Sequence, residues 1–129
     1  MKSFFLDTSV IIDYLRGKKE AVELLNNLDG QMTSSYLCLS ELYEGVHRVK
    51  EKEEVEGRIK KFFSSLSEVY ALNENTAKKF GELRAELKKQ GKVIEDIDIF
   101  LAATCLVYGE IMVTFNKKHF SHIQGLQIL

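Results

Sequence analysis

A length of 129 residues suits one ordinary domain, so we expect a single domain over residues 1–129 with one hydrophobic core. The 45% hydrophobic and 29% charged residues are typical of a globular protein and exclude a disordered or fibrous chain. The formal net charge of −1 gives no whole-protein basic field for nucleic acid, and the apolar stretches are too short for a membrane span, so we expect a cytoplasmic protein.

The hydrophobic periodicity predicts strands that alternate with helices. In chain order the predicted elements are a strand at 3–6, helices at 10–15 and 21–28, a strand at 31–34, helices at 38–49 and 52–65, a strand at 68–72, helices at 76–89 and 96–108, a strand at 111–114 and a closing segment at 126–129. We expect Thr8 or Ser9 to cap the first helix. The strands at 3–6 and 111–114 are mostly apolar, as buried strands are, and strands that alternate with helices indicate an α/β fold with a mostly parallel central sheet flanked by helices on both faces.

Acidic residues and one asparagine stand where these elements begin or end. Asp7 follows the first strand, Glu41 lies on the helix after the second strand, Asp96 and Asp98 open the late helix, and Asn116 follows the last strand. Sites in parallel α/β sheets form outside the carboxyl ends of the strands, so these residues could converge. Clustered carboxylates repel one another, and Mg²⁺ or Mn²⁺ is the usual ion that offsets this repulsion. Phosphoryl chemistry is the natural inference.

Each of these residues also has an ordinary structural role open to it. Asp7 could be a helix cap or a turn residue, and Glu41 could be a solvated helix carboxylate. One of Asp96 and Asp98 could have only a structural role, in which its negative charge stabilises the N-terminus of the helix. Of the two, we favour Asp98 as the metal ligand. Asn116 could make a turn.

The cysteines and histidines give weaker signals. Cys38 and Cys105 stand alone in apolar segments without a CxxC spacing, which indicates reduced, buried thiols. His47, His119 and His122 include one HxxH pair without matching cysteines, a weak zinc pattern. We expect all three histidines on the solvated surface.

Four segments, in order and at matching spacing, resemble the successive motifs of PIN-domain ribonucleases. They read LDTSVII at 6–12, SELYEG at 40–45, IEDIDIFLAA at 94–103 and VTFN at 113–116. The resemblance runs over nearly the whole chain and is closest to the VapC-type toxins of toxin–antitoxin pairs, which are compact single PIN domains of this size.

The resemblance implies a metal-dependent endoribonuclease that uses one or two Mg²⁺ or Mn²⁺ ions to cleave RNA phosphodiester bonds. By motif, Asp7, Glu41 and Asp98 take the catalytic, metal-binding positions. It also implies a VapB-like antitoxin partner and a homodimer. The generous apolar faces over residues 10–28 and 39–63 are compatible with a groove for that antitoxin, although they could simply pack on each other.

The same motifs suggest supporting residues around the ions. Asp96 matches an acid that many relatives carry, and Asn116 stands where a fourth acid is often Asp, which puts a second metal site in doubt. Hydroxyl groups near the ions would come from Thr8, Ser9 and Thr114. A basic rim could contact RNA phosphates, although each of its members could equally be ordinary surface lysine: Lys88, Lys89, Lys92, Lys117 and Lys118.

Two other functions remain open. A PIN-like binding module that has lost catalysis would fit the asparagine at position 116. A Mg²⁺-dependent phosphoacceptor receiver would also be an α/β protein with acids at strand ends. A receiver, however, needs its acceptor Asp after the central strand, and the strand predicted at 68–72 is followed by Asn73.

Overall fold

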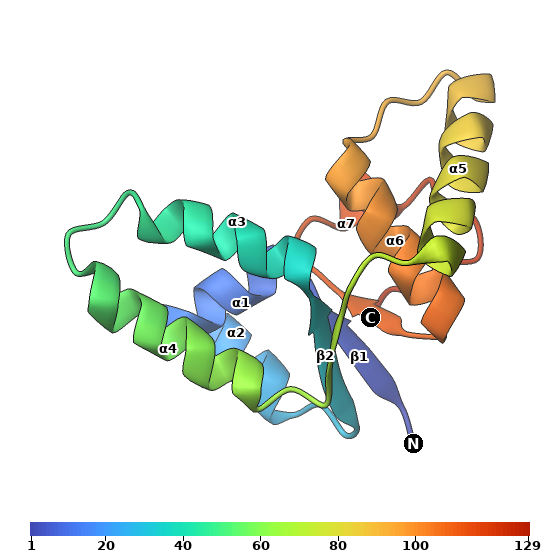
Figure 1. The fold of residues 1–129 in the computed structure, drawn as a ribbon. Coiled ribbons are helices and arrows are strands. Elements are labelled where there is room, and N and C mark those ends of the chain that lie inside the picture. The colour runs from blue at the N-terminus through green and yellow to red at the C-terminus, as the bar shows by residue number, and fades with distance from the viewer.

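A four-stranded parallel sheet in the order β3-β2-β1-β4 lies at the centre of the protein, seen here in a computed structural model that describes all residues 1–129 (Figure 1). The elements in chain order are β1 (Ser3–Leu6), α1 (Thr8–Leu15), α2 (Lys19–Asn26), β2 (Gln31–Ser35), α3 (Tyr36–Val46), α4 (Lys52–Ser64), β3 (Glu68–Tyr70), α5 (Glu74–Lys89), α6 (Asp96–Tyr108), β4 (Ile111–Val113) and α7 (Lys117–Phe120). The predicted α/β fold with a parallel sheet is confirmed.

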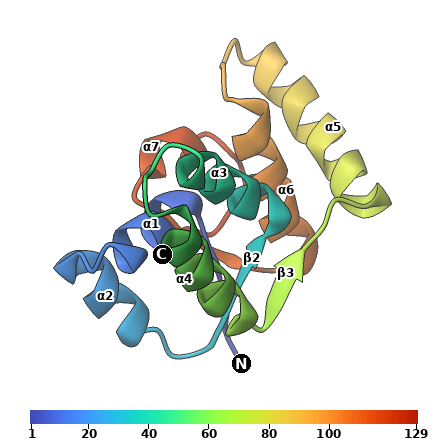
Figure 2. The same ribbon diagram turned by 60° about the vertical axis from the view of Figure 1, so that its left-hand side comes forward.

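Helices cover both faces of the sheet, as predicted. Along β1, Phe4 and Leu6 join the core cluster that includes residues of α1, α3 and α4, whereas Phe5 joins the cluster formed with α6 and the C-terminal segment. Successive strand side chains point to opposite faces, so an all-apolar strand must be buried on both sides. Figure 2 shows α1 to α4 on one side of the strands and α5 and α6 on the other.

The helix caps differ in part from the prediction. The cap of α1 is Asp7, not Thr8 or Ser9, because its carboxylate accepts a 2.7 Å hydrogen bond from the Thr8 backbone N–H. Helix α5 begins two residues early, at Glu74, because Asn73 and Thr76 form a reciprocal capping box.

The chain after β4 holds one element that the sequence analysis did not predict. Helix α7 is a single turn, too short for periodicity to reveal, and it is anchored by the buried Phe120. The predicted closing segment joins the sheet edge only through one parallel bridge, between Met112 and Ile128. The Met112 N–H donates to Gln127, and the Leu129 N–H donates to Met112.

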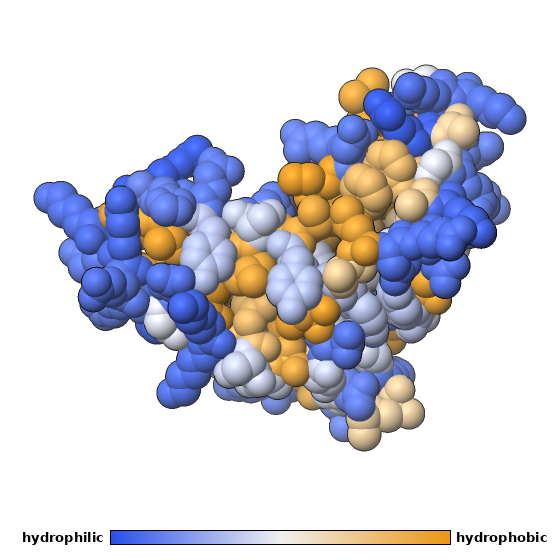
Figure 3. All heavy atoms as spheres, viewed as in Figure 1, coloured by the Kyte–Doolittle hydropathy of each residue, from blue (hydrophilic) through white to orange (hydrophobic).

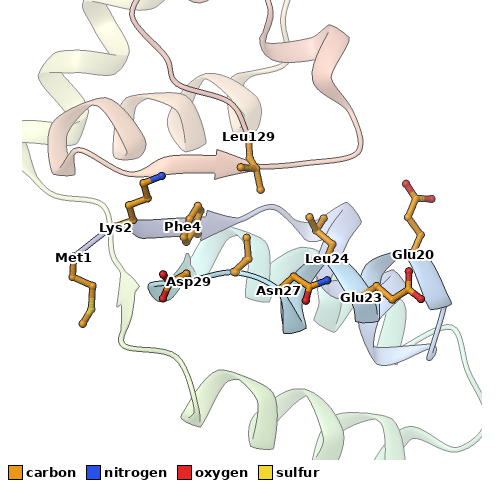
Figure 4. Close-up of a pocket in the computed structure, with 10 residues that line it drawn as sticks. Met1, Lys2, Phe4, Glu20, Glu23, Leu24, Asn27, Asp29 and Leu129 are labelled. Carbon is orange, nitrogen blue, oxygen red and sulfur yellow. The ribbon is translucent and has the colours of Figure 1, made fainter.

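Two surface features flank the sheet. A hollow of about 800 Å³ lies at the amino end of β1, where Lys2 and Phe4 face Leu24 of α2 and the C-terminal Leu129 (Figure 4). This is the end of the strand opposite Asp7. Figure 3 shows apolar residues gathered in the middle of another face, between α3 and the α5–α6 pair. None of the helices combines the length and the apolar character needed to cross a bilayer.

Candidate active site

Asp7 is buried at the carboxyl end of β1 and is held by hydroxyl groups. Its Oδ2 accepts a 2.7 Å hydrogen bond from Thr114 and a 3.2 Å bond from Ser9, while Oδ1 accepts from the Thr8 N–H. Strands β1 and β4 are paired, and where their pairing ends the Asp7 backbone N–H donates to the Val113 carbonyl. This pairing places Asp7 beside Thr114, the residue that follows Val113. The carboxylate therefore has a fixed position.

Glu41 approaches this carboxylate from α3. The Thr8 hydroxyl donates a 2.7 Å hydrogen bond to its Oε1, so one residue contacts both acids. Burial raises the pKa of the Glu41 carboxyl, and the negative charges of Asp7 and Asp98 raise it further. The hydrogen bond from Thr8 acts in the opposite direction. Glu41 is thus a carboxylate whose charge is poorly compensated within the chain.

Asp98, in the first turn of α6, is the third acid of this group. Burial and then the charge of Asp7 raise the pKa of its carboxyl, whereas the contact with His119 lowers it. The His119 Nδ1 lies 3.1 Å from Asp98 Oδ2. Asp7, Glu41 and Asp98 come from three separate elements, and their charges act on one another at the carboxyl end of the sheet.

Two further ligand candidates are placed differently. The Asp96 carboxylate lies 3.5 Å from Nε of Arg84 on α5, and Asp96 is not among the main charges that act on Glu41 or Asp98. The Asn116 side chain is exposed and makes no hydrogen bond within the chain, although its backbone N–H donates to the Thr114 hydroxyl.

Two residues near the acids were missed by the sequence analysis. His119 is exposed, as expected, but its Nδ1 also lies against the Asp98 carboxylate, a contact that the sequence analysis did not predict. Glu95, the exposed N-cap residue of α6, adds negative charge beside Asp98. Its place within the IEDID segment was the available signal, whereas nothing local to position 119 indicated a contact 21 residues away.

The carboxylate oxygens of Asp7, Glu41 and Asp98 are chemically suited to a divalent cation, but they are not gathered closely enough to surround one. Carboxylate oxygens with uncompensated negative charge are the ligands that Mg²⁺ and Mn²⁺ prefer. As the side chains stand, no three His, Cys, Asp or Glu residues lie close enough together to hold an ion. A bound cation would offset the mutual repulsion of Asp7, Glu41 and Asp98.

The two thiols lie in the protein interior, as predicted. Cys38 and Cys105 are both buried and unpaired with each other. Burial raises the pKa of the Cys38 thiol to about 11, and the negative charge of Asp7 contributes. The thiolate form is therefore scarce at neutral pH, and neither cysteine is a plausible nucleophile.

A groove of about 260 Å³ begins beside Glu41 and runs between α1, α3 and α4. Its floor is apolar, and Arg16 and Arg58 contribute positive charge. The complete lining is Ile12, Leu15, Arg16, Glu41, Leu42, Gly45, Val46, Val49, Val55, Arg58 and Ile59. The apolar faces over residues 10–28 and 39–63 therefore pack only partly on each other and leave a groove beside Glu41.

Comparisons with known proteins agree with this arrangement. The PIN domain family model matches residues 4–126. Ribonuclease VapC2 of Haemophilus influenzae is 32% identical, with 98% of this chain and 96% of that protein covered. The tRNA(fMet)-specific endonuclease VapC of Shigella flexneri is 31% identical, with 98% and 96% covered. The structure of DNA-bound VapBC from Salmonella typhimurium superposes with a TM-score of 0.89 at 28% identity, covering 100% of this chain and 98% of that one. On the extent of these matches and the shared architecture, the chain belongs to the PIN domain family.

Proposed function

We propose that this protein is a metal-dependent endoribonuclease that cleaves RNA phosphodiester bonds as the toxin of a toxin–antitoxin pair. The observation that carries the proposal is the mutual repulsion between the charges of Asp7, Glu41 and Asp98 at the carboxyl end of the sheet. The VapC ribonucleases that align over nearly the whole chain support the same activity.

Asp7, Glu41 and Asp98 would hold one or two Mg²⁺ or Mn²⁺ ions. Such an ion, when bound, neutralises the scissile phosphate and lowers the pKa of an attacking water. Thr114 and Ser9 fix the Asp7 carboxylate, and Thr8 fixes that of Glu41, so these hydroxyls hold the ligands in place. Asn116 could supply a neutral oxygen, and Asp96 would reach the ion only after leaving Arg84.

The RNA would approach over a basic rim beside the acids. Lys117 and Lys118 open α7, which three residues separate from the end of β4, and Lys88 and Lys89 stand in the last turn of α5. Lys92 contacts the His122 ring at 2.8 Å. These lysines would bind phosphates and so orient the strand without reading its bases.

A VapB-like antitoxin would occupy the groove between α1, α3 and α4. Most of the residues that line the groove are apolar and Glu41 is one of them, so a segment lying in it would also contact this acid of the site. The solved relative from Salmonella typhimurium is itself a VapBC complex. The homodimer remains a prediction, as does the cytoplasmic location, which suits the two reduced thiols.

The test is cleavage of a panel of fluorescent RNAs by the purified protein with Mg²⁺, with Mn²⁺ and with EDTA. We expect metal-dependent cutting that falls at least about 100-fold in Asp7→Asn. Asp13→Asn, a change on α1 at a residue paired with Lys18, is the matched control and should retain activity. A folded protein that binds Mn²⁺ but cuts no RNA would instead indicate an inactive binding module, and one that binds no Mn²⁺ would refute the site.

A further inference from the structure

We propose that His119 is a positioning residue of the nuclease site, where its imidazole N–H holds the Asp98 carboxylate and thereby sets the affinity for a divalent cation. This inference rests on the proposed function. The Nδ1 of His119 lies 3.1 Å from Asp98 Oδ2, within hydrogen-bonding distance. A carboxylate oxygen accepts, so Nδ1 carries the proton and donates.

The contact is built by the fold around α7. The neighbouring Phe120 is buried to 1% exposure and anchors this single turn in the core. The His119 backbone N–H donates to the Asn116 carbonyl, which ties the turn to the end of β4. The His119 side chain is 57% exposed while that of Asp98 is 17% exposed, so the imidazole bridges from solvent to a largely enclosed acid.

Asp98, like Glu41, has a single hydrogen-bond donor, whereas Asp7 accepts from three. The negative charges of Asp7 and Glu95 act against its carboxylate, and His119 is its sole side-chain hydrogen-bond partner. Without the imidazole, repulsion would favour rotation of Asp98 away from Asp7. The imidazole offsets that repulsion before any cation is present.

The geometry also leaves one oxygen of Asp98 available. Oδ2 accepts from His119, while Oδ1 has no hydrogen-bond partner in the chain. Outer groups that hold ligand carboxylates usually contribute 10–100-fold to metal affinity or activity. Asp7 and Glu41 are held in this way by hydroxyls, and Asp98 is held by the histidine.

The experiment compares His119→Ala and His119→Asn with the wild type. The asparagine side chain places an N–H group at the position of Nδ1, so it can restore the donor without the ring. His47→Ala is the control, because His47 is exposed at the end of α3 and contacts none of the acids. Mn²⁺ affinity is measured calorimetrically without RNA, and kcat and KM are measured on a cleaved fluorescent RNA.

We expect His119→Ala to weaken Mn²⁺ binding by about 10-fold or more and to lower kcat with little change in KM. His119→Asn should recover most of both losses, and His47→Ala should match the wild type. NMR of the metal-free wild type should find His119, unlike His47, protonated at Nδ1, and Asp98→Ala should abolish that preference.

The outcomes separate this inference from the proposed function. If the wild type binds Mn²⁺ and cuts RNA but His119→Ala does the same equally well, the positioning role is wrong and the nuclease stands. Equal losses in the alanine and asparagine variants would also overturn it, because the donor would then not be the feature that matters. If the wild type neither binds Mn²⁺ nor cuts RNA, the proposed function fails first.

Discussion

The hydroxyl of Tyr70 donates a 2.6 Å hydrogen bond to Oε2 of Glu110, a buried carboxylate directly before β4. The same carboxylate accepts from Ser3 at 2.7 Å and from Thr33 at 2.9 Å. One donor therefore comes from each of β1, β2 and β3, and no lysine or arginine contributes. Glu110, on the α6 side of the sheet, therefore links all four strands. The three hydroxyl groups take the place of the water molecules that would solvate an exposed carboxylate.

Removing the Tyr70 hydroxyl should destabilise the protein. We expect Tyr70→Phe to lower the free energy of unfolding by about 1–3 kcal/mol, because a buried carboxylate loses one of its donors. Burial and the bond to Glu110 also raise the pKa of Tyr70. Tyr108→Phe is the control: its ring stacks on Tyr70 at 4.3 Å, but its hydroxyl accepts only from the exposed Asn73. Urea denaturation measures both, and equal losses would contradict the role of Glu110.

The Glu110 contacts explain where prediction from the sequence stopped. Asp7 and Asn116 could be predicted to lie at one edge because each follows an apolar strand, and parallel strands end together. Glu110 stands between a glycine and an apolar strand, where an acid is typical of a loop. Its partners Ser3 and Thr33 are 107 and 77 residues away, so no local pattern reveals them. The His119 contact was missed for the same reason.

The raised pKa of Glu41 has a consequence for stability. In the folded protein this carboxyl binds its proton more tightly than at its ordinary value of 4.5. Between 4.5 and the raised pKa the folded state holds more protons than the unfolded chain, so the free energy of unfolding falls as the pH rises through that window. Above the window the full penalty of the buried charge remains.

Glu41→Gln should therefore raise the melting temperature at pH 7 in EDTA and have a much smaller effect at pH 4, where the carboxyl is mostly protonated in both states. The Gln side chain can still accept from Thr8. Glu44→Gln on the same helix is the control, since Glu44 is exposed and paired with Arg48. Stabilisation of equal size at both pH values would show that charge repulsion at Glu41 is not its cause.

If the lysines of the basic rim bind RNA phosphates, removing them should change how RNA affinity depends on salt concentration. We expect Lys117→Ala and Lys118→Ala each to weaken RNA binding and to reduce the slope of log affinity against log salt by about 0.7, one phosphate contact on a single strand. Binding is measured in an Asp7→Asn background so that the RNA stays intact. Lys19→Ala on α2, whose lysine pairs with Glu23, should leave the slope unchanged. An unchanged slope in the first two variants would place the RNA elsewhere.

A substitution in the groove between α1, α3 and α4 should affect antitoxin binding but not catalysis. Val49 lines the groove and is partly exposed, so Val49→Asp puts a charge on an apolar contact surface without touching the acids. We expect affinity for a VapB-like antitoxin to fall by more than about tenfold while RNA cleavage is retained. Val93→Asp, at a fully exposed valine outside the groove, should bind normally. Similar losses in both variants would argue against the groove as the docking surface.

The predicted homodimer should bury the apolar face between α3 and the α5–α6 pair (Figure 3). Tyr36 and Leu72 are exposed there and line one hollow of about 370 Å³ together with Thr104 of α6. Large exposed apolar side chains on one face favour self-association through a symmetric contact. We expect light scattering to find a dimer for the wild type and a monomer for Leu72→Glu, with Val93→Glu remaining dimeric. A wild-type monomer at high micromolar concentration would refute the dimer, and a dimeric Leu72→Glu would move its interface to another face.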